Sequence, residues 1–226
     1  MLYNTTVNPG DVIAVGDIHG CFDQFQGFLN HVKGTGAQVI LLGDLIDRGP
    51  DDLGVLNAAR NLCENPEVWG LESFAVIRGN HEQMFLNALD GYGYDDWVKN
   101  GGNESIWKEL AAFADWLRAL PYFVTVGETL FAHAGAFPGK DPQQFLVTEY
   151  LREMFLWNRG PFLEVGPQFE LWNPNLKKIV FGHTPRGPLP YTVPNGICID
   201  TGVFFTGLLT AYNATRETFF QIGVTE

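Results

Sequence analysis

The chain has 226 residues, of which 46% are hydrophobic and 18% charged, a globular composition that suits a single domain over residues 1–226. Its formal net charge of −12, without a run of Lys or Arg, predicts that nucleic acid is not a partner. The 3 Cys form no CxxC pattern, and the sequence shows neither a signal-peptide pattern nor an apolar run long enough to span a bilayer. We therefore expect a cytoplasmic protein without disulfides or a membrane partner.

Short apolar runs separated by turn residues predict buried β-strands. They lie at residues 12–15, 39–42, 74–77, 129–132, 178–181 and 197–199, and residues 208–212 and 218–222 predict a terminal hairpin. Apolar residues at helical spacing predict helices at 22–32, 55–63 and 106–120. Strands and helices alternate in the first half, and strands dominate the second. This order predicts an α/β protein with a layered α/β/β/α arrangement around a central β-sandwich.

Five of the predicted strands run directly into glycine-flanked clusters of polar residues. The clusters read GDIHG at 16–20, GDLIDRG at 43–49, RGNHE at 78–82, AHAG at 132–135 and GHT at 182–184. Because ligands bind beyond the carboxyl ends of strands in α/β sheets, we expect one site to collect all five clusters. Four of the 5 His lie in them, and His31, on a predicted helix, is expected at the surface.

The residue types in these clusters indicate a metal site. Carboxylate, imidazole and amide oxygens together suit divalent ions such as Mn, Fe or Zn. Asp17 and His19 are two residues apart, so in an extended segment they point to the same side and can hold one ion. No Cys lies among the clustered ligand residues, which argues against a closed structural zinc site.

The motifs, in this order, resemble the signature of the calcineurin-like metallophosphoesterases, and more closely that of the PPP-type serine/threonine protein phosphatases. The resemblance spans residues 16–202. The segments GNHEQM at 79–84, WVKNGG at 97–102, WNR at 157–159 and IDTG at 199–202 are most similar to the compact bacterial and bacteriophage lambda-type members. This resemblance implies the α/β/β/α metallophosphoesterase fold.

The resemblance also implies a dinuclear centre with two divalent metal ions, Mn first, with Fe or Zn as alternatives. One ion would be bound by Asp17 and His19, and Asp44 would bridge both ions. The second ion would be bound by Asn80, His133 and His183.

The remaining roles that the resemblance implies concern the phosphate and the leaving group. His81 would be the general acid, and Asp47 would hold and polarise it. Arg48, Arg78 and Arg159 would bind phosphate oxygens. Two alternatives stay open: Arg78 braces the Gly-Asn-His turn, or Arg159 forms a surface contact.

Four further residues carry open interpretations. Glu82 orients loop backbone instead of taking part in the chemistry, and Asp200 has a structural or supporting role. Trp97 and Trp107 belong to the core or line a substrate groove.

The implied reaction is hydrolysis of phosphomonoesters by direct attack of a metal-bridging hydroxide. The expected substrate is a phosphorylated protein or peptide. A symmetric dinucleoside tetraphosphatase or a broad-specificity small-molecule phosphatase is the alternative. Such tetraphosphatases usually lack the acidic residue found here at Asp47 and usually carry Asp where this chain has Glu82. A catalytically inactive scaffold is disfavoured, because no ligand and no general acid is missing.

Overall fold

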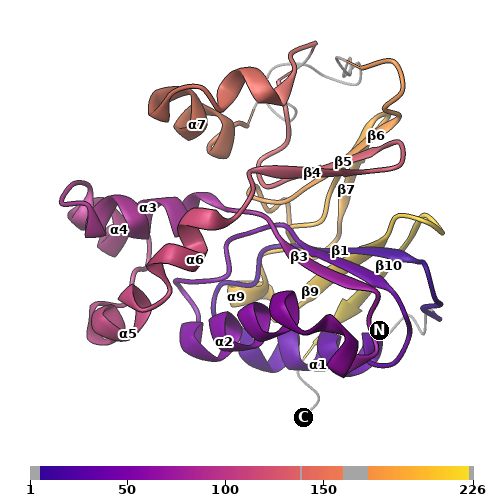
Figure 1. The fold of residues 1–226 in the computed structure, drawn as a ribbon, viewed down its shortest axis with the longest axis horizontal. Coiled ribbons are helices and arrows are strands. Elements are labelled where there is room, and N and C mark those ends of the chain that lie inside the picture. Colours follow the sequence, from indigo (N-terminus) through magenta and orange to yellow (C-terminus); the bar gives the residue numbers. More distant parts are fainter. Residues whose placement is uncertain (1–5, 138, 160–172, 224–226) are drawn as a thin grey trace.

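The computed structural model describes residues 6–137, 139–159 and 173–223. Two five-stranded sheets lie at its centre, sheet A in the order β10-β9-β1-β2-β3 and sheet B in the order β4-β5-β6-β8-β7 (Figure 1). The strands are β1 Val12–Val15, β2 Gln38–Leu41, β3 Ser73–Val76, β4 Phe123–Val126, β5 Thr129–Ala132, β6 Lys178–Phe181, β7 Tyr191–Val193, β8 Gly196–Cys198, β9 Leu209–Asn213 and β10 Thr218–Ile222. The predicted strands and terminal hairpin are confirmed to within one or two residues, whereas the edge strands β4 and β7 were not predicted.

Helices connect the parallel strands and flank the sheets. They are α1 Phe22–Val32, α2 Asp52–Glu64, α3 Asn80–Leu89, α4 Tyr94–Lys99, α5 Trp107–Ala111, α6 Ala114–Ala119, α7 Glu149–Leu156 and α9 Val203–Thr206, with 3-10 turns η1 Pro66–Trp69, η2 Glu104–Ile106 and η3 Pro142–Phe145. β1, β2 and β3 pair in parallel through α1 and α2, and β5, β6 and β8 pair in parallel in sheet B.

Alternation along the strands creates the layers. In β1, Ile13 and Val15 face a core shared with α1 and α2, while Val12 and Ala14 face the core between the two sheets. In sheet B, Phe131 of β5 faces that same inner core, and its neighbours pack against the other side, where η3 and α7 contribute Phe145 and Phe155. The predicted α/β/β/α arrangement around a β-sandwich is confirmed.

The two predicted helices of the first half are confirmed, and α2 begins at a capped residue, because the Asp51 side chain accepts a hydrogen bond from the Gly54 N–H at 2.8 Å. The single helix predicted over 106–120 is wrong. The chain tightens there, with Ala112 N–H bonded to Glu109 O and Phe113 N–H bonded to Leu110 O, so it forms α5 and α6 separately.

The strand ends determine where the polar clusters meet. β1, β2 and β3 of sheet A and β5 and β6 of sheet B all end toward the same edge of the sandwich, beside α3 (Figure 1). Across the described ranges, no helix combines the length and the apolar character needed to cross a bilayer.

Candidate metal centre

The loops that follow these strands have unusual backbone conformations. Among the described residues, six non-glycine residues have positive φ, and five of them belong to the polar clusters. These five are His19 (46°), Asp44 (49°), Asp47 (70°), Arg48 (72°) and His183 (69°). Such conformations raise the energy of L-residues and are kept only where surrounding contacts impose them.

Backbone and carboxylate contacts impose the conformation at the second and third loops. The Glu82 carboxylate accepts hydrogen bonds from the N–H groups of Asp44 at 2.9 Å, Leu45 at 2.7 Å and Gly79 at 2.8 Å. The loop after β2 is thereby fixed to the start of α3. At Gly79 a Cβ atom would lie 2.3 Å from the Asp44 nitrogen, so only glycine fits. Glu82 therefore orients loop backbone, the role that the sequence left open.

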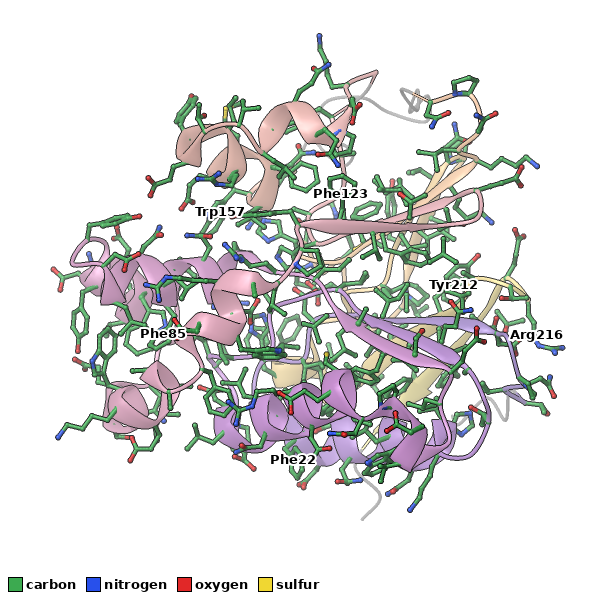
Figure 2. The ribbon with its side chains drawn as sticks, viewed as in Figure 1. Phe22, Phe85, Phe123, Trp157, Tyr212 and Arg216 are labelled. Atoms are coloured by element: carbon green, nitrogen blue, oxygen red, sulfur yellow. The ribbon has the colours of Figure 1, made fainter. Side chains whose placement is uncertain are left out.

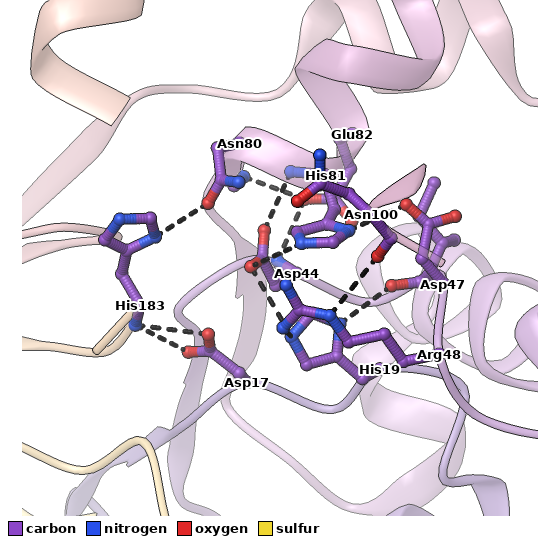
Figure 3. Close-up of polar contacts among 12 residues, drawn as sticks. Asp17, His19, Asp44, Asp47, Arg48, Asn80, His81, Glu82, Asn100 and His183 are labelled. Carbon is purple, nitrogen blue, oxygen red and sulfur yellow. Dashed lines mark hydrogen bonds and ion pairs between the residues drawn. The ribbon is translucent and has the colours of Figure 1, made fainter. Parts of the chain in front are cut away.

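Asp44 lies at the centre of the site, with imidazoles on both sides (Figure 3). Its carboxylate is 3.6 Å from His19 Nε2, 3.9 Å from His81 Nε2 and 3.4 Å from His133 Nε2. Two groups of side chains have ligand atoms within 4.8 Å of one another: His19, Asp44 and His81, and Asp44, His133 and His183. The structure thus brings Asp44 to the position shared by two candidate ion sites.

The hydrogen-bond partners of the imidazoles indicate which ring nitrogens are free to bind a cation. His133 Nδ1 lies 2.8 Å from the Leu42 carbonyl, an acceptor, so Nδ1 carries the hydrogen and Nε2 a lone pair. That lone pair faces Asn80 Oδ1 at 2.8 Å, which is another acceptor. His183 Nδ1 lies 2.8 Å from the same Asn80 oxygen, so the two rings direct a nitrogen at one amide oxygen. Acceptor atoms that face one another are what a divalent ion among them would satisfy.

Burial keeps the imidazoles of His19, His133 and His183 neutral. It lowers the pKa of His19 to about 3, and it also lowers the pKa of His133. The pKa of His183 lies well below its ordinary value because of burial, with His133 nearby adding to the effect. Neutral imidazole is the form that binds a metal ion, so these residues are ready to act as ligands at neutral pH.

Asp17 lies at one side of this arrangement (Figure 3). Both of its carboxylate oxygens are 3.1 Å from the His183 N–H, which donates to them. Its carboxyl group also interacts electrostatically with that of Asp200, and burial raises the pKa of Asp200 to about 7. Asp17 thus joins the loop after β1 to the loop after β6. It lies next to the two groups of candidate ligands that share Asp44 but belongs to neither of them.

His81 differs from the other clustered imidazoles in its partner. Its Nδ1 donates to Asp47 Oδ2 at 2.7 Å, and both side chains are buried. Burial opposes charge on the ring, but the carboxylates of Asp44 and Asp47 outweigh it and raise the pKa of His81. A buried imidazole that keeps its proton beside a metal site is suited to act as a general acid.

Asp47 is itself held by two further side chains. Its Oδ1 accepts from Trp97 Nε1 at 3.0 Å, and its N–H donates to Asp52 Oδ1 at 3.0 Å. Trp97 is fully buried, so the suggestion that it lines a substrate groove is wrong. Trp107 packs its ring against Trp97 at 5.2 Å and belongs to the same aromatic group.

The first arginine, Arg48, stands at the mouth of the site. Its Nη1 is 2.8 Å from His19 Nε2, and its Nε donates to the Asn100 carbonyl at 3.4 Å. Its guanidinium stacks on Phe204 at 5.0 Å. Arg159 is exposed and close enough for its charge to help lower the pKa of His183, after the larger effects of burial and His133.

Arg78 is oriented away from the clustered ligands. Its guanidinium donates to Gln83 Oε1 at 2.9 Å, to the Tyr122 hydroxyl at 2.8 Å and to the Arg118 carbonyl. These contacts tie the start of α3 to the end of α6 and to Tyr122. They match the loop-bracing alternative and give no contact to the site that a bound phosphate would share.

Comparison with known proteins places this geometry in a family. Residues 10–203 match the family model described as calcineurin-like phosphoesterase. The chain belongs to that family. This metallophosphoesterase is 33% identical over 216 residues to serine/threonine-protein phosphatase 1 of Salmonella typhimurium (strain LT2), covering 88% of the chain and 89% of the relative.

Other relatives of this metallophosphoesterase carry a different activity in their names. It is 33% identical to the symmetrical bis(5′-nucleosyl)-tetraphosphatase of Neisseria meningitidis serogroup A, covering 92% of the chain and 94% of the relative. Its fold is also similar to a protein serine/threonine phosphatase from Saccharomyces cerevisiae, with a TM-score of 0.66 at 19% identity, covering 99% and 82% of the two chains. The chain is thus a metallophosphoesterase whose named relatives divide between a serine/threonine-protein phosphatase and symmetrical bis(5′-nucleosyl)-tetraphosphatases.

Sequence reasoning missed three residues of the metallophosphoesterase site. Asp52 holds the Asp47 backbone, Asn100 supplies a carbonyl to Arg48, and Phe204 supplies the surface on which Arg48 stacks. Asn100 and Phe204 lie within or beside the segments that resemble the lambda-type members, which was the available signal. Asp52 had none, because an acidic residue at a helix start is ordinary.

Proposed function

We propose that this metallophosphoesterase is a metal-dependent phosphomonoesterase that acts on phosphoserine and phosphothreonine in proteins. The observation that carries the proposal is the buried His81–Asp47 pair, whose ring and carboxylate are 2.7 Å apart. Serine and threonine alkoxides are poor leaving groups, so their phosphoesters need a general acid, which accelerates such reactions about 10²–10⁴-fold.

The dinuclear centre that we propose uses the clustered ligands in full. Its ligands would be Asp17, His19, Asp44, Asn80, His133 and His183, and Mn is the first ion to test. When bound, two divalent ions supply a water molecule of lowered pKa and offset the charge of the phosphate. The neutral imidazoles, and the approach of His133 Nε2 and His183 Nδ1 to the Asn80 amide oxygen, support this ligand set.

The chain's own side chains would complete the reaction. Arg48 and Arg159 bind phosphate oxygens, for which the planar guanidinium is well shaped. His81 delivers its Nε2 proton to the leaving oxygen, and Asp47 stabilises the ring in the correct orientation. Arg78 is left out of the phosphate contacts in this proposal, because its guanidinium is already bound to Tyr122 and Gln83.

A second candidate is hydrolysis of symmetric dinucleoside tetraphosphates, which the name of the Neisseria relative favours. Phosphate is a better leaving group than an alkoxide, so such a reaction depends less on a general acid. The retained Asp47, paired with His81 and held by Trp97, favours the phosphomonoesterase. Broad activity on small phosphoesters is compatible with either substrate.

The test is a comparison of substrates on one metal-loaded preparation. We expect phosphoserine and phosphothreonine peptides to give a higher kcat/KM than diadenosine tetraphosphate, and chelation to abolish both activities. The proposed substrate class is wrong if diadenosine tetraphosphate is cleaved efficiently while the peptides are left intact. If hydrolysis continues at the same rate after chelation, in protein that metal analysis shows to be free of metal, the proposed metal dependence is wrong.

A further inference from the structure

A groove leads away from the metal centre between α3 and α4 on one side and α7 on the other. It encloses about 760 Å³, and its wall includes Tyr92, Asp96, Glu149, Tyr150, Glu153 and Trp157. Trp157 lies between α7 and α3 in Figure 2. We call this feature the α3–α7 groove.

The inner end of the groove meets the site. The Trp157 ring stands edge-on to the His183 ring, with 5.6 Å between centroids. Asn100, which also lines the groove, accepts a hydrogen bond from Arg48 through its carbonyl. A phosphate held near His183 and Arg48 therefore leaves the rest of its substrate at the entrance of this groove.

The groove wall is acidic. Of the described residues that line it, Asp96, Glu149 and Glu153 are acidic and none is Lys or Arg. Glu153 accepts hydrogen bonds from Asn87 Nδ2 at 2.8 Å and from Trp157 Nε1 at 3.2 Å. Both donors are neutral, so they fix the carboxylate in place without cancelling its charge.

The other two carboxylates are also poorly compensated. Glu149 accepts from the Tyr92 hydroxyl, again a neutral donor. Asp96 lies 3.9 Å from Lys99, but both side chains are about three-quarters exposed, at 76% and 74%. Such exposed pairs contribute little and are screened by salt. Among the described residues, the pair of Asp96 with Lys99 is thus the only ion pair that these three carboxylates form.

Arginines near the groove are engaged elsewhere. Arg118 forms an ion pair with Asp90, and Arg152 Nη1 donates to the Leu146 carbonyl at 3.0 Å. Arg78 is held by the contacts described above. All three line an adjacent cavity of about 440 Å³, whose wall also includes Tyr92, Glu149 and Glu153. Glu149 and Glu153 therefore line both cavities, but among the described residues no arginine forms an ion pair with either carboxylate.

Aromatic surface complements this charge. Tyr150 is 73% exposed and Tyr92 is 47% exposed, so both rings are open to a ligand. Lys and Arg side chains combine an apolar stem with a cationic head, and they pack on aromatic rings while the head reaches a carboxylate. A ligand with a negatively charged chain would be repelled by the carboxylates of this groove.

We propose that the α3–α7 groove binds the residues that flank the phosphorylated side chain and selects for Lys and Arg among them. This specificity rests on the proposed phosphoprotein phosphatase activity. The same carboxylates disfavour dinucleoside polyphosphates, whose remaining phosphates would have to lie along the groove.

The test uses phosphothreonine peptides of equal length that carry either Arg or Glu on both sides of the phosphorylated residue. Each kcat/KM is divided by that for p-nitrophenyl phosphate on the same protein, which removes general effects on the metal centre. We expect the Arg peptide to be preferred at least about fivefold by the wild-type protein, and less so at high salt.

Two substitutions address the groove itself. Asp96→Asn and Glu149→Gln keep side-chain shape and hydrogen-bonding capacity, and together they are expected to bring the preference to about twofold or less. Glu64→Gln is the matched control, because Glu64 is an exposed helical acid on α2, away from the groove. It should keep the wild-type preference.

The outcomes separate this inference from the proposed function. If both peptides are hydrolysed equally well, or the preference persists in the double variant, the groove does not select basic residues, and the phosphatase activity stands. If neither peptide is hydrolysed while diadenosine tetraphosphate is, the proposed function fails and the groove assignment fails with it.

Discussion

His133 and His81 are both buried and both approach Asp44, at 3.4 and 3.9 Å, yet they have opposite protonation properties. His133 donates its Nδ1 hydrogen to a neutral carbonyl, that of Leu42, and burial lowers its pKa. His81 donates to the carboxylate of Asp47, and Asp44 and Asp47 raise its pKa against the effect of burial.

In the proposed site, the partner of Nδ1 separates the proposed metal ligand His133 from the proposed proton donor His81. A carbonyl fixes the tautomer and leaves a neutral ring with a free lone pair on Nε2. A carboxylate fixes the same tautomer and also stabilises the charged ring. Both rings point at the same shared carboxylate, so position alone does not distinguish them.

The largest effect is expected on the ligand side. His133→Ala removes an imidazole from the group that contains Asp44 and His183, and should lower both bound metal and turnover of p-nitrophenyl phosphate by more than roughly a hundredfold, since even supporting residues of metal sites cost 10–100-fold. Metal analysis after dialysis, with a rate assay, measures both. His31→Ala, on α1, is the matched control and should retain metal and rate. A His133→Ala protein with full metal content would contradict the assignment.

A smaller and more selective effect is expected on the acid side. Asp47→Asn removes the charge that raises the pKa of His81, so turnover of alkyl phosphates should fall about a hundredfold, with a smaller loss on p-nitrophenyl phosphate. Protonated His81 is the active form, and its pKa is raised in the native protein. The alkaline limb of the pH–rate profile should therefore move to lower pH in the variant. Equal losses on both substrates, with an unchanged limb, would argue against the acid role.

Trp97→Phe tests the support of that acid pair. It removes the hydrogen bond to Asp47 Oδ1, worth about 1 kcal/mol, and should slow alkyl phosphate hydrolysis roughly three- to tenfold. Trp107→Phe is the matched control, because Trp107 packs on Trp97 while, among the described tryptophans, Trp97 is the one that donates to Asp47. If the two variants lose activity equally, packing and not the hydrogen bond explains the loss.

The smallest effect is expected at Phe204, on which the Arg48 guanidinium stacks. Phe204→Leu loses a cation–π contact of about 0.5–1 kcal/mol, so KM should rise roughly two- to fivefold with kcat little changed. Phe205→Leu serves as control, since Phe205 is 60% exposed and, within the described part of the chain, its ring packs on Phe204 and not on Arg48. A fall in kcat without a change in KM would show that Phe204 does not act through substrate binding.

The ligand loops could be predicted from the sequence because each follows an apolar run that can only be a buried strand. The pairing of Asp47 with Trp97 could not, since the two residues are far apart in the chain and only tertiary contact joins them. Arg78 shows the same limit: its type suits phosphate, but its direction is set by Tyr122 on a distant segment.

Helices were predicted well only where an apolar stripe faces a sheet. α1 and α2 have such stripes, whereas α4 is short and polar and buries Trp97 alone. α3 begins at Asn80, inside the polar cluster, so its first turn was interpreted as loop. As a result, the sequence identified Asn80 and His81 as candidate site residues without predicting the helix that carries them.

The positive φ angles of the clustered residues have a consequence for engineering. At Arg48, with φ of 72°, glycine would relieve a backbone cost of roughly 1 kcal/mol and also remove the side chain proposed to bind phosphate. A search for thermostable variants should therefore recover inactive proteins altered at these loops. With the phosphate-binding role proposed for Arg48, stability and turnover compete at this position.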